Sequence, residues 1–204
     1  MDGTQRPVMG RPRGFDVDQA LERALEVFWR QGYEGATLTA LTEAMGITRT
    51  SMYAAYGNKE ELFRKALERY TLGPASYGVR ALAEPTARAV AEHVLHGAVQ
   101  ATTRPDRPAG CLCVQGALAT GEGGQAAHDA LVAWRRDGEE ALRARFARAH
   151  DEGDLPADSD PSLLARYIST VAYGIAVQAA TGVPREDLRR IIDLALQSWP
   201  TRSS

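Results

Sequence analysis

The sequence predicts an all-α protein of about nine helices, because apolar residues recur at helical spacing in one segment after another. Its composition agrees, since Ala, Arg, Leu and Glu dominate, β-branched residues are sparse and aromatic residues make up only 7%. Residues that stop helices or fix turns separate the segments, as at 104–108, 121–124, 153–156 and 181–184. With 204 residues, 44% of them hydrophobic, the chain is long enough to bury a substantial core.

The first helix is predicted from Asp16, a suitable N-cap, to Gly32. Two short helices follow. The first begins at Thr37 or Leu38 and ends at Ala44, and the second covers residues 49–53 with Thr48 as its cap and Gly57 after its end. The second short helix is too short to be stable alone, so we expect its neighbours to hold it.

A further helix is predicted over residues 58–70, where Asn58 is the cap and Glu60 and Glu61 favour the positive end of the helix dipole. Longer helices are then predicted over residues 86–102, 112–120, 125–150, 161–180 and 184–199. No fixed period repeats among these segments, which argues against a solenoid.

Charge and hydropathy exclude several classes of protein. Lys and Arg total 24 against 26 for Asp and Glu, so a net charge of -2 gives no overall attraction for nucleic acid, and any such binding must come from a local patch. The first 14 residues form such a patch, with three arginines against one acid. The N-terminus has no signal-peptide core and no apolar run is long enough to span a bilayer, so we expect a cytoplasmic protein with no membrane partner.

The sequence offers little for catalysis or metal binding. Cys111 and Cys113 are separated by one residue, which matches neither a redox Cys-x-x-Cys pair nor a zinc site. His93 and His96 could share a metal, but no third ligand of suitable spacing follows, so no metal and no cofactor is predicted. Nucleophile-elbow, metalloprotease and phosphate-loop motifs are missing, so the chain is predicted not to be an enzyme.

The two short helices have the anatomy of a helix-turn-helix, in which the second helix lies in the major groove of DNA. Arg49, Thr50 and Ser51 begin that second helix, where side chains reach base edges. A guanidinium matches guanine with two hydrogen bonds, and hydroxyls serve bases or phosphates. A helical adaptor that binds no DNA is the alternative, but it would have no need to expose the polar surface of residues 48–51.

Residues 15–70 resemble the TetR family of transcriptional regulators. The resemblance is carried by the ordered series Ala24, Phe28, Gly32, Tyr33, Thr37, Leu41, Ala44, Gly46, Ile47, Met52, Tyr53, Tyr56, Lys59, Glu60, Glu61 and Leu62. It implies a DNA-binding domain at 15–57, a connecting helix at 58–74 and an effector-binding, dimerising domain at 75–204. Residues 1–14, which contain Pro7 and Pro12 and lack a hydrophobic period, are predicted to be a flexible basic arm.

The resemblance also implies site residues. Arg49, Thr50 and Ser51 would line the major groove, and Lys59 would hold a phosphate at the start of the connecting helix, where the helix dipole adds to its attraction. Contacts to the phosphate backbone would come from Thr37, Thr39, Tyr53 and Tyr56. The family often has an aromatic or His residue where this chain has Ala55, and Phe where it has Tyr56, which puts one backbone contact in question. Both tyrosines have an alternative role, which is to pack the short helices together.

The arm segment Gly10-Arg11-Pro12-Arg13-Gly14 resembles the core of an AT-hook, so Arg11 and Arg13 are candidates for the minor groove of A·T-rich DNA. A solvated tail is the alternative.

The last two predicted helices carry apolar stripes, and in the resembling family such a pair forms a four-helix bundle with its copy. The candidate dimer residues are Leu164, Tyr167, Ile168, Val171, Leu188, Ile191, Ile192, Ala195 and Trp199. The alternative is that these stripes belong to the core of one chain. A two-fold dimer would place two recognition helices in successive major grooves about 34 Å apart.

The segment Gly110-Cys111-Leu112 resembles the entry to helix six in one branch of the family, some of whose members sense electrophiles, oxidants or metals. A thiol at a helix N-terminus is more reactive, so Cys111 is a candidate sensor, although Cys is also a common buried hydrophobe. Trp134, Phe146, Tyr173 and Val177 are candidate walls of an effector pocket, or else ordinary core.

The sequence thus predicts a homodimeric repressor on a pseudo-palindromic DNA operator, released by an unidentified small-molecule or thiol-reactive effector. The signal would pass through the helix at 58–70. The effector, the operator, the regulated genes and any activating role are not predicted.

Overall fold

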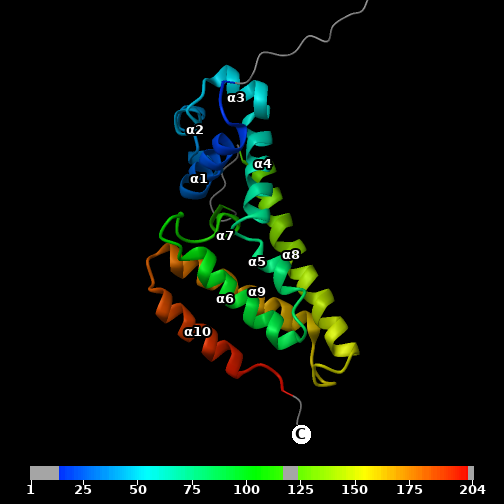
Figure 1. Cartoon of the computed structure of the whole chain (residues 1–204). Helices are drawn as coiled ribbons and strands as arrows, with labels where there is room; N and C mark the ends of the chain where they lie inside the picture. The colour runs from blue at the N-terminus through cyan, green and yellow to red at the C-terminus, as the bar shows by residue number, and fades with distance from the viewer. Residues whose placement is uncertain (1–13, 117–123, 202–204) are drawn as a thin grey trace, which may run out of the picture.

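The computed structural model describes residues 14–116 and 124–201. Within these two ranges the chain forms helices and no strand, which confirms the all-α prediction (Figure 1). The upper part of Figure 1 holds α1 (Val17–Gly35), α2 (Leu38–Met45), α3 (Arg49–Tyr56) and α4 (Lys59–Leu72). Below them lie α5 (Tyr77–Ala81), α6 (Ala87–Thr102), α7 (Leu112–Gln115), α9 (Pro161–Ala180) and α10 (Arg185–Gln197), whereas α8 (Gln125–Asp151) starts beside α4 and runs down into this lower part.

The caps that the sequence predicts are formed. Asp16 accepts hydrogen bonds from the backbone N–H groups of Asp18 and Gln19, and Asn58 and Glu61 form a reciprocal capping box at the start of α4. Gly32, the predicted end of the first helix, has a φ of 69° and kinks α1, which then continues to Gly35.

Two short helices differ from the prediction. The one-turn helix α5 was not predicted, because five residues are too few to show a helical period. The helix predicted over residues 112–120 is seen as α7, which ends at Gln115, and residues 117–120 lie outside the part of the chain that the structure describes.

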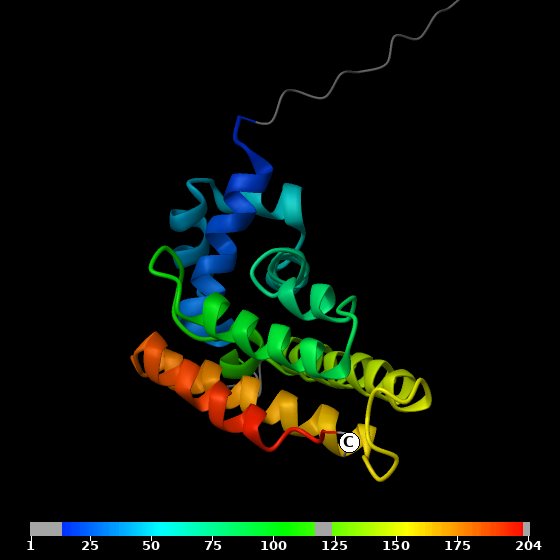
Figure 2. The same cartoon turned by 60° about the horizontal axis from the view of Figure 1, so that its bottom comes forward.

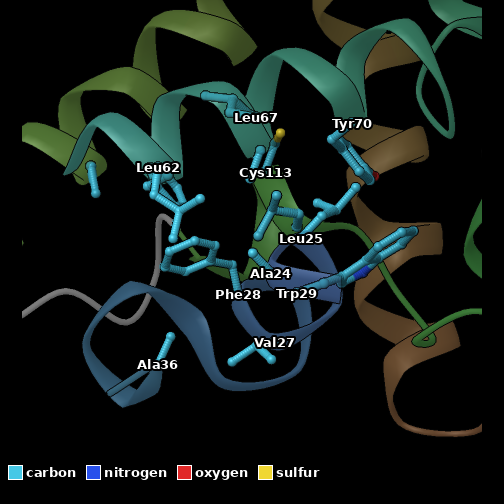
Figure 3. Close-up of a cluster of buried hydrophobic side chains, with 14 of the residues drawn as sticks. Ala24, Leu25, Val27, Phe28, Trp29, Ala36, Leu62, Leu67, Tyr70 and Cys113 are labelled. Carbon is cyan, nitrogen blue, oxygen red and sulfur yellow. The ribbon is translucent and has the colours of Figure 1, made fainter. Parts of the chain in front are cut away.

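One hydrophobic core joins α1, α2, α3 and α4 to α7 and the start of α8. In Figure 3, Leu25, Phe28 and Trp29 of α1 face Leu62 and Tyr70 of α4. The ring of Phe28 meets that of Phe63 edge to face at 5.1 Å, and Trp29 meets Tyr70 in the same way at 4.8 Å. Because α7 contributes Leu112 and Cys113 to this core, and its N-cap contributes Cys111, the two halves of the chain are packed together.

A second core lies among α5, α6, α8, α9 and α10. Helix α9 packs against both α6 and α8, and Figure 2 shows α9 and α10 side by side. None of the helices in the described ranges combines the length and the hydropathy needed to cross a bilayer.

Candidate nucleic-acid interface and effector cavity

The helix-turn-helix is fixed by two threonine caps and one glycine. Thr37 accepts a hydrogen bond from the Ala40 N–H at 3.1 Å and begins α2, and Thr48 accepts one from the Ser51 N–H at 3.1 Å and begins α3. Between them Gly46 adopts a left-handed conformation with φ 69° and ψ 33°, which a residue with a Cβ atom rarely takes. The buried side chains of Leu41 and Met52 hold the two helices against the core.

The predicted base-reading residues lie on one end of α3. Arg49 and Thr50 are exposed, whereas Ser51 is half-buried and its hydroxyl accepts a hydrogen bond from Thr48 at 3.0 Å. The Arg49 guanidinium donates to the hydroxyl of Thr39 at 2.8 Å, which orients it across the two short helices. Tyr53, one turn further along α3, is 48% exposed. The arrangement leaves a cation, a hydroxyl and a phenol facing solvent on one short helix.

Tyr56 does not fit its predicted role as a phosphate contact. Its ring is 2% exposed within the first core, and its hydroxyl donates to the backbone carbonyl of Val17 at 2.6 Å. The alternative interpretation, that the ring packs the short helices, is therefore correct for Tyr56. The sequence could not distinguish the two roles, because a tyrosine on a short helix suits either.

Lys59 is the first residue of α4 and is half-buried. Its ammonium nitrogen lies 4.4 Å from the centroid of the Tyr33 ring, a cation–π contact. Burial lowers the pKa of Lys59, while the negative charge of Glu34 acts in the opposite direction. A lysine held at a helix N-terminus in this way is placed to meet an anion.

The arm residues Arg11 and Arg13 lie outside the described residues. The chain enters the described part at Gly14 and Phe15, which line a groove together with Gly46 and Thr48 of the turn between α2 and α3. The arm therefore begins beside the helix-turn-helix.

The predicted dimer stripe divides into two faces. Within one chain, the second core takes up Ile168, Leu188, Ile192, Ala195 and Trp199, all 6% exposed or less. Partly buried against that core are Leu164, Tyr167 and Val171. Only Ile191 of the predicted set is largely exposed, at 49%. The assignment of the five buried residues to a dimer surface is therefore corrected, because they already pack within the chain.

Of the apolar side chains that α9 and α10 do expose, the predicted dimer set contained only Ile191. These side chains are Leu163, Val177, Ile191 and Leu194, between 40% and 65% exposed. Helical periodicity identifies apolar positions but does not say which side of a helix meets its own chain, so the sequence carried no signal to separate the two faces.

Two of the four predicted pocket residues line a cavity. Trp134 and Tyr173 are among the walls of a space of about 370 Å3 bounded by α4, α5, α6, α8 and α9. Phe146 is fully buried and packs edge to face on Trp199 at 5.5 Å, away from the cavity, and Val177 is exposed on α9. Tyr77 and Ser169 also line the cavity and were missed, since neither follows a distinctive pattern in sequence.

Cys111 lies at the N-cap of α7 and is buried. Its sulfur accepts a hydrogen bond from the Tyr70 hydroxyl at 3.1 Å. Hydrogen bonds from Cys113 and, more weakly, from Tyr70 lower the pKa of Cys111 to about 7 against the effect of burial, whereas burial raises the pKa of Cys113. The first proton lost from this pair therefore comes from Cys111.

The segment before Cys111 is tied to α1. Arg107 pairs with Glu22 of α1, and Glu22 also meets Arg69 of α4 at 3.2 Å. Burial raises the pKa of Glu22, but these two arginines outweigh it and the net effect is a lowered pKa. This three-residue network was not anticipated, because the partners are far apart in the sequence.

The structure does not place His93 and His96 in a cluster of metal-binding side chains. His93 lies 2.8 Å from the carboxylate of Glu84, and the described residues contain no group of three or more His, Cys, Asp or Glu side chains that could hold a metal ion.

Comparisons with known proteins match both halves of the chain. Residues 20–66 match the family described as bacterial regulatory proteins, tetR family, and residues 87–194 match the tetracyclin repressor-like C-terminal domain. The HTH-type transcriptional repressor ComR of Escherichia coli is 29% identical over 98% of this chain and 97% of its own length. The regulator YezE of Bacillus subtilis is 31% identical over 92% of this chain and 98% of its own.

A solved structure of a TetR family regulator is also similar to this chain. A cysteine mutant of the TetR family transcriptional regulator CifR, solved in complex with 26-base-pair double-stranded operator DNA, is similar with a TM-score of 0.89 and 45% sequence identity. The similarity covers 93% of this chain and all of that one.

Proposed function

Since this chain belongs to the TetR family of bacterial transcriptional regulators, we propose that it is a repressor that binds operator DNA as a homodimer and leaves it when an effector binds. Its relatives regulate transcription, and the chain is a regulator rather than an enzyme. A repressor acts on the chromosome, so its proposed location is the cytoplasm.

The observation that carries the proposal is the exposed polar end of α3. Arg49 and Thr50 face solvent at the N-terminal end of a helix that the Thr48 cap and a buried Met52 hold in place. A rigid helix end with an exposed guanidinium is suited to read base edges in the major groove. The similarity to a regulator solved on its operator supports this use of the surface.

Contacts to the DNA backbone would surround this helix. Thr37 caps α2 and Thr39 lies in its first turn, and both are exposed; Tyr53 is exposed in the middle of α3, and Lys59 begins α4. We keep these four as phosphate contacts, and Ser51 as a residue lining the groove. The arm at 1–14 would place Arg11 and Arg13 in the adjacent minor groove, which suits an arm that begins beside the α2–α3 turn.

The proposed dimer would use the exposed apolar side chains of α9 and α10. Leu163, Val177, Ile191 and Leu194 are large apolar residues that face solvent on two adjacent helices of the second core. Isologous pairing of this surface with its copy would remove it from water and give the two-fold symmetry that a pseudo-palindromic operator requires. In the proposed division, residues 15–57 bind DNA, 58–74 connect and 75–204 bind the effector and dimerise.

The proposed release couples the cavity to the DNA-binding helices. Thr71 and Ala75, at and just after the C-terminal end of α4, form part of the cavity wall, and Lys59 begins the same helix at the DNA end. An effector can shift the equilibrium only if it binds the released state more tightly than the DNA-bound state. A thiol-reactive effector acting at Cys111, as in the Gly-Cys-Leu branch of the family, is a second route, favoured by the lowered pKa of that thiol.

The test is DNA binding by the purified full-length protein. Operator sequences are selected from a random DNA pool, and affinity for the selected sequence is measured over a salt series. We expect a steep fall in affinity with salt, as counterion release requires. If no salt-sensitive binding survives selection, the repressor proposal is wrong and the helical adaptor takes its place.

A further inference from the structure

The cavity between α4 and α8 has the size and the lining of a ligand site. Its volume of about 370 Å3 lies near the lower end of the range of roughly 300–1,000 Å3 for small-molecule pockets. Three aromatic side chains, Tyr77, Trp134 and Tyr173, line it. The remaining apolar wall is formed by Ala75, Val79, Leu82, Val94, Ala141, Leu142 and Ala172.

Four polar side chains of the wall, those of Thr71, Trp134, Ser169 and Tyr173, are already engaged with one another or with the backbone. The indole N–H of Trp134 donates to the Thr71 hydroxyl at 2.9 Å, and the Tyr173 hydroxyl donates to the carbonyl of Arg135 at 3.3 Å. Ser169, which is 4% exposed, is hydrogen-bonded to Tyr173. A ligand would therefore meet few groups that need a new hydrogen-bond partner.

Charge is confined to the edge of the cavity. Among the described residues that line the cavity, Asp137 is the only charged one. Its side chain is 68% exposed, and Arg136 pairs with it at 3.1 Å. It lies next to exposed Gly138 on α8. A charged ligand group placed deeper would lose its hydration without gaining an ionic partner, which is costly.

From this lining we infer that the effector is a small, uncharged, ring-bearing molecule that binds the cavity without forming a covalent bond. This inference rests on the proposed release by an effector. Flat apolar rings stack well against the three aromatic walls. Because Cys111 is buried and does not line the cavity, binding there needs no reaction with the thiol.

The probe is N-phenyl-1-naphthylamine, an uncharged fluorophore whose emission rises in apolar surroundings, titrated into the full-length protein. Binding is then competed with 2-naphthalenemethanol, 2-naphthoate and 2-naphthylmethylammonium, which share one ring system and differ in charge. We expect the neutral alcohol to displace the probe at a concentration at least about tenfold lower than either ion requires.

A matched pair of variants locates the site. Ala141→Trp fills the cavity from α8, whereas Ala144→Trp places the same side chain on an exposed position of that helix. Probe affinity should fall at least about tenfold in Ala141→Trp, as expected for loss of a buried apolar ring, and stay unchanged in Ala144→Trp. Thermal unfolding of both variants, and operator binding, show that each is folded.

The outcomes separate this inference from the proposed function. Tighter binding of an ion than of the alcohol, or equal probe binding by both variants, would overturn the inference while salt-sensitive operator binding still upheld the repressor. Probe binding that leaves operator affinity unchanged would overturn the effector role of this ligand class. Failure of operator binding itself, with the probe bound as expected, would count against the proposed function instead.

Discussion

The indole nitrogen of Trp29 donates a hydrogen bond to the backbone carbonyl of Gly110 across 3.2 Å, which ties α1 to the segment leading into α7. Gly110 has a φ of 81°, and a Cβ atom there would lie 2.9 Å from the Cβ atom of Ala180. Three residues earlier, Arg107 pairs with Glu22 of the same helix. The DNA-binding helices are thus held to the second half of the chain through α1 as well as through α4.

Trp29→Phe tests this tie. The substitution keeps an aromatic ring but leaves the buried Gly110 carbonyl without its donor, so we expect a loss of about 1–3 kcal/mol in the free energy of unfolding. Denaturant unfolding of the full-length protein measures it. Trp199→Phe, a buried indole in the second core, controls for the smaller ring. Equal losses in the two variants would show that ring size, not the hydrogen bond, matters at position 29.

Local signals in the sequence were sufficient to predict where the helices start, but not to predict which of their side chains are exposed. Asp16, Thr37, Thr48 and Asn58 cap helices through contacts within three residues, so each start could be read from the sequence. The pairing of Tyr56 with Val17 joins residues 39 positions apart, and no local pattern reports it. For the same reason, the core face and the exposed face of α10 were merged into one apolar stripe.

Arg49 and Lys59 should differ in how they affect DNA binding. Arg49→Ala removes the exposed guanidinium of α3, so we expect a loss of about 1–3 kcal/mol and relaxed preference at one base pair. Lys59→Ala should weaken binding to all sequences alike and reduce the salt slope by about one. Affinities for the selected operator and its single-base variants measure both. A uniform loss over all base variants for Arg49→Ala would contradict base reading.

Tyr56→Phe should lower stability without touching DNA binding. The hydroxyl donates to the Val17 carbonyl at 2.6 Å in a partly buried site, and its loss should cost about 1–2 kcal/mol of unfolding free energy. Operator affinity of the folded variant should equal that of the parent. Tyr53→Phe is the matched control. Because its phenol is exposed, this substitution should lower operator affinity and leave the free energy of unfolding unchanged. A drop in operator affinity for Tyr56→Phe would show that the Tyr56 hydroxyl does contact a phosphate.

The proposed dimer surface predicts that a charge on α10 separates the two copies. Leu194 is 64% exposed, and Leu194→Glu should weaken self-association by at least about tenfold, because a carboxylate would be buried in an apolar interface. Sedimentation equilibrium measures the change. Leu72→Glu places the same charge on another exposed leucine, at the end of α4, and should leave the dimer intact. A dimer that survives Leu194→Glu would place the interface elsewhere.

Cys111 should titrate well below an ordinary cysteine. Its pKa is lowered from 9.0 to about 7 by hydrogen bonds from Cys113 and Tyr70, so thiolate absorbance at 240 nm should rise around pH 7. A thiol whose pKa is lower in the folded chain than in the unfolded chain stabilises the folded state, and it does so fully at pH values above the pKa of the unfolded chain. The gain is therefore absent below about pH 7, grows as the pH rises toward 9 and is fully present above it.

Tyr70→Phe removes the hydroxyl that donates to Cys111 at 3.1 Å and should move the titration upward, toward the ordinary value. Cys113→Ala should move it further in the same direction, because the Cys113 hydrogen bond is the larger effect. Cys111→Ser should abolish the step, which assigns it. If the parent protein shows no thiolate step below pH 8, the hydrogen bonds do not offset burial, and the thiol-reactive route to release loses its chemical basis.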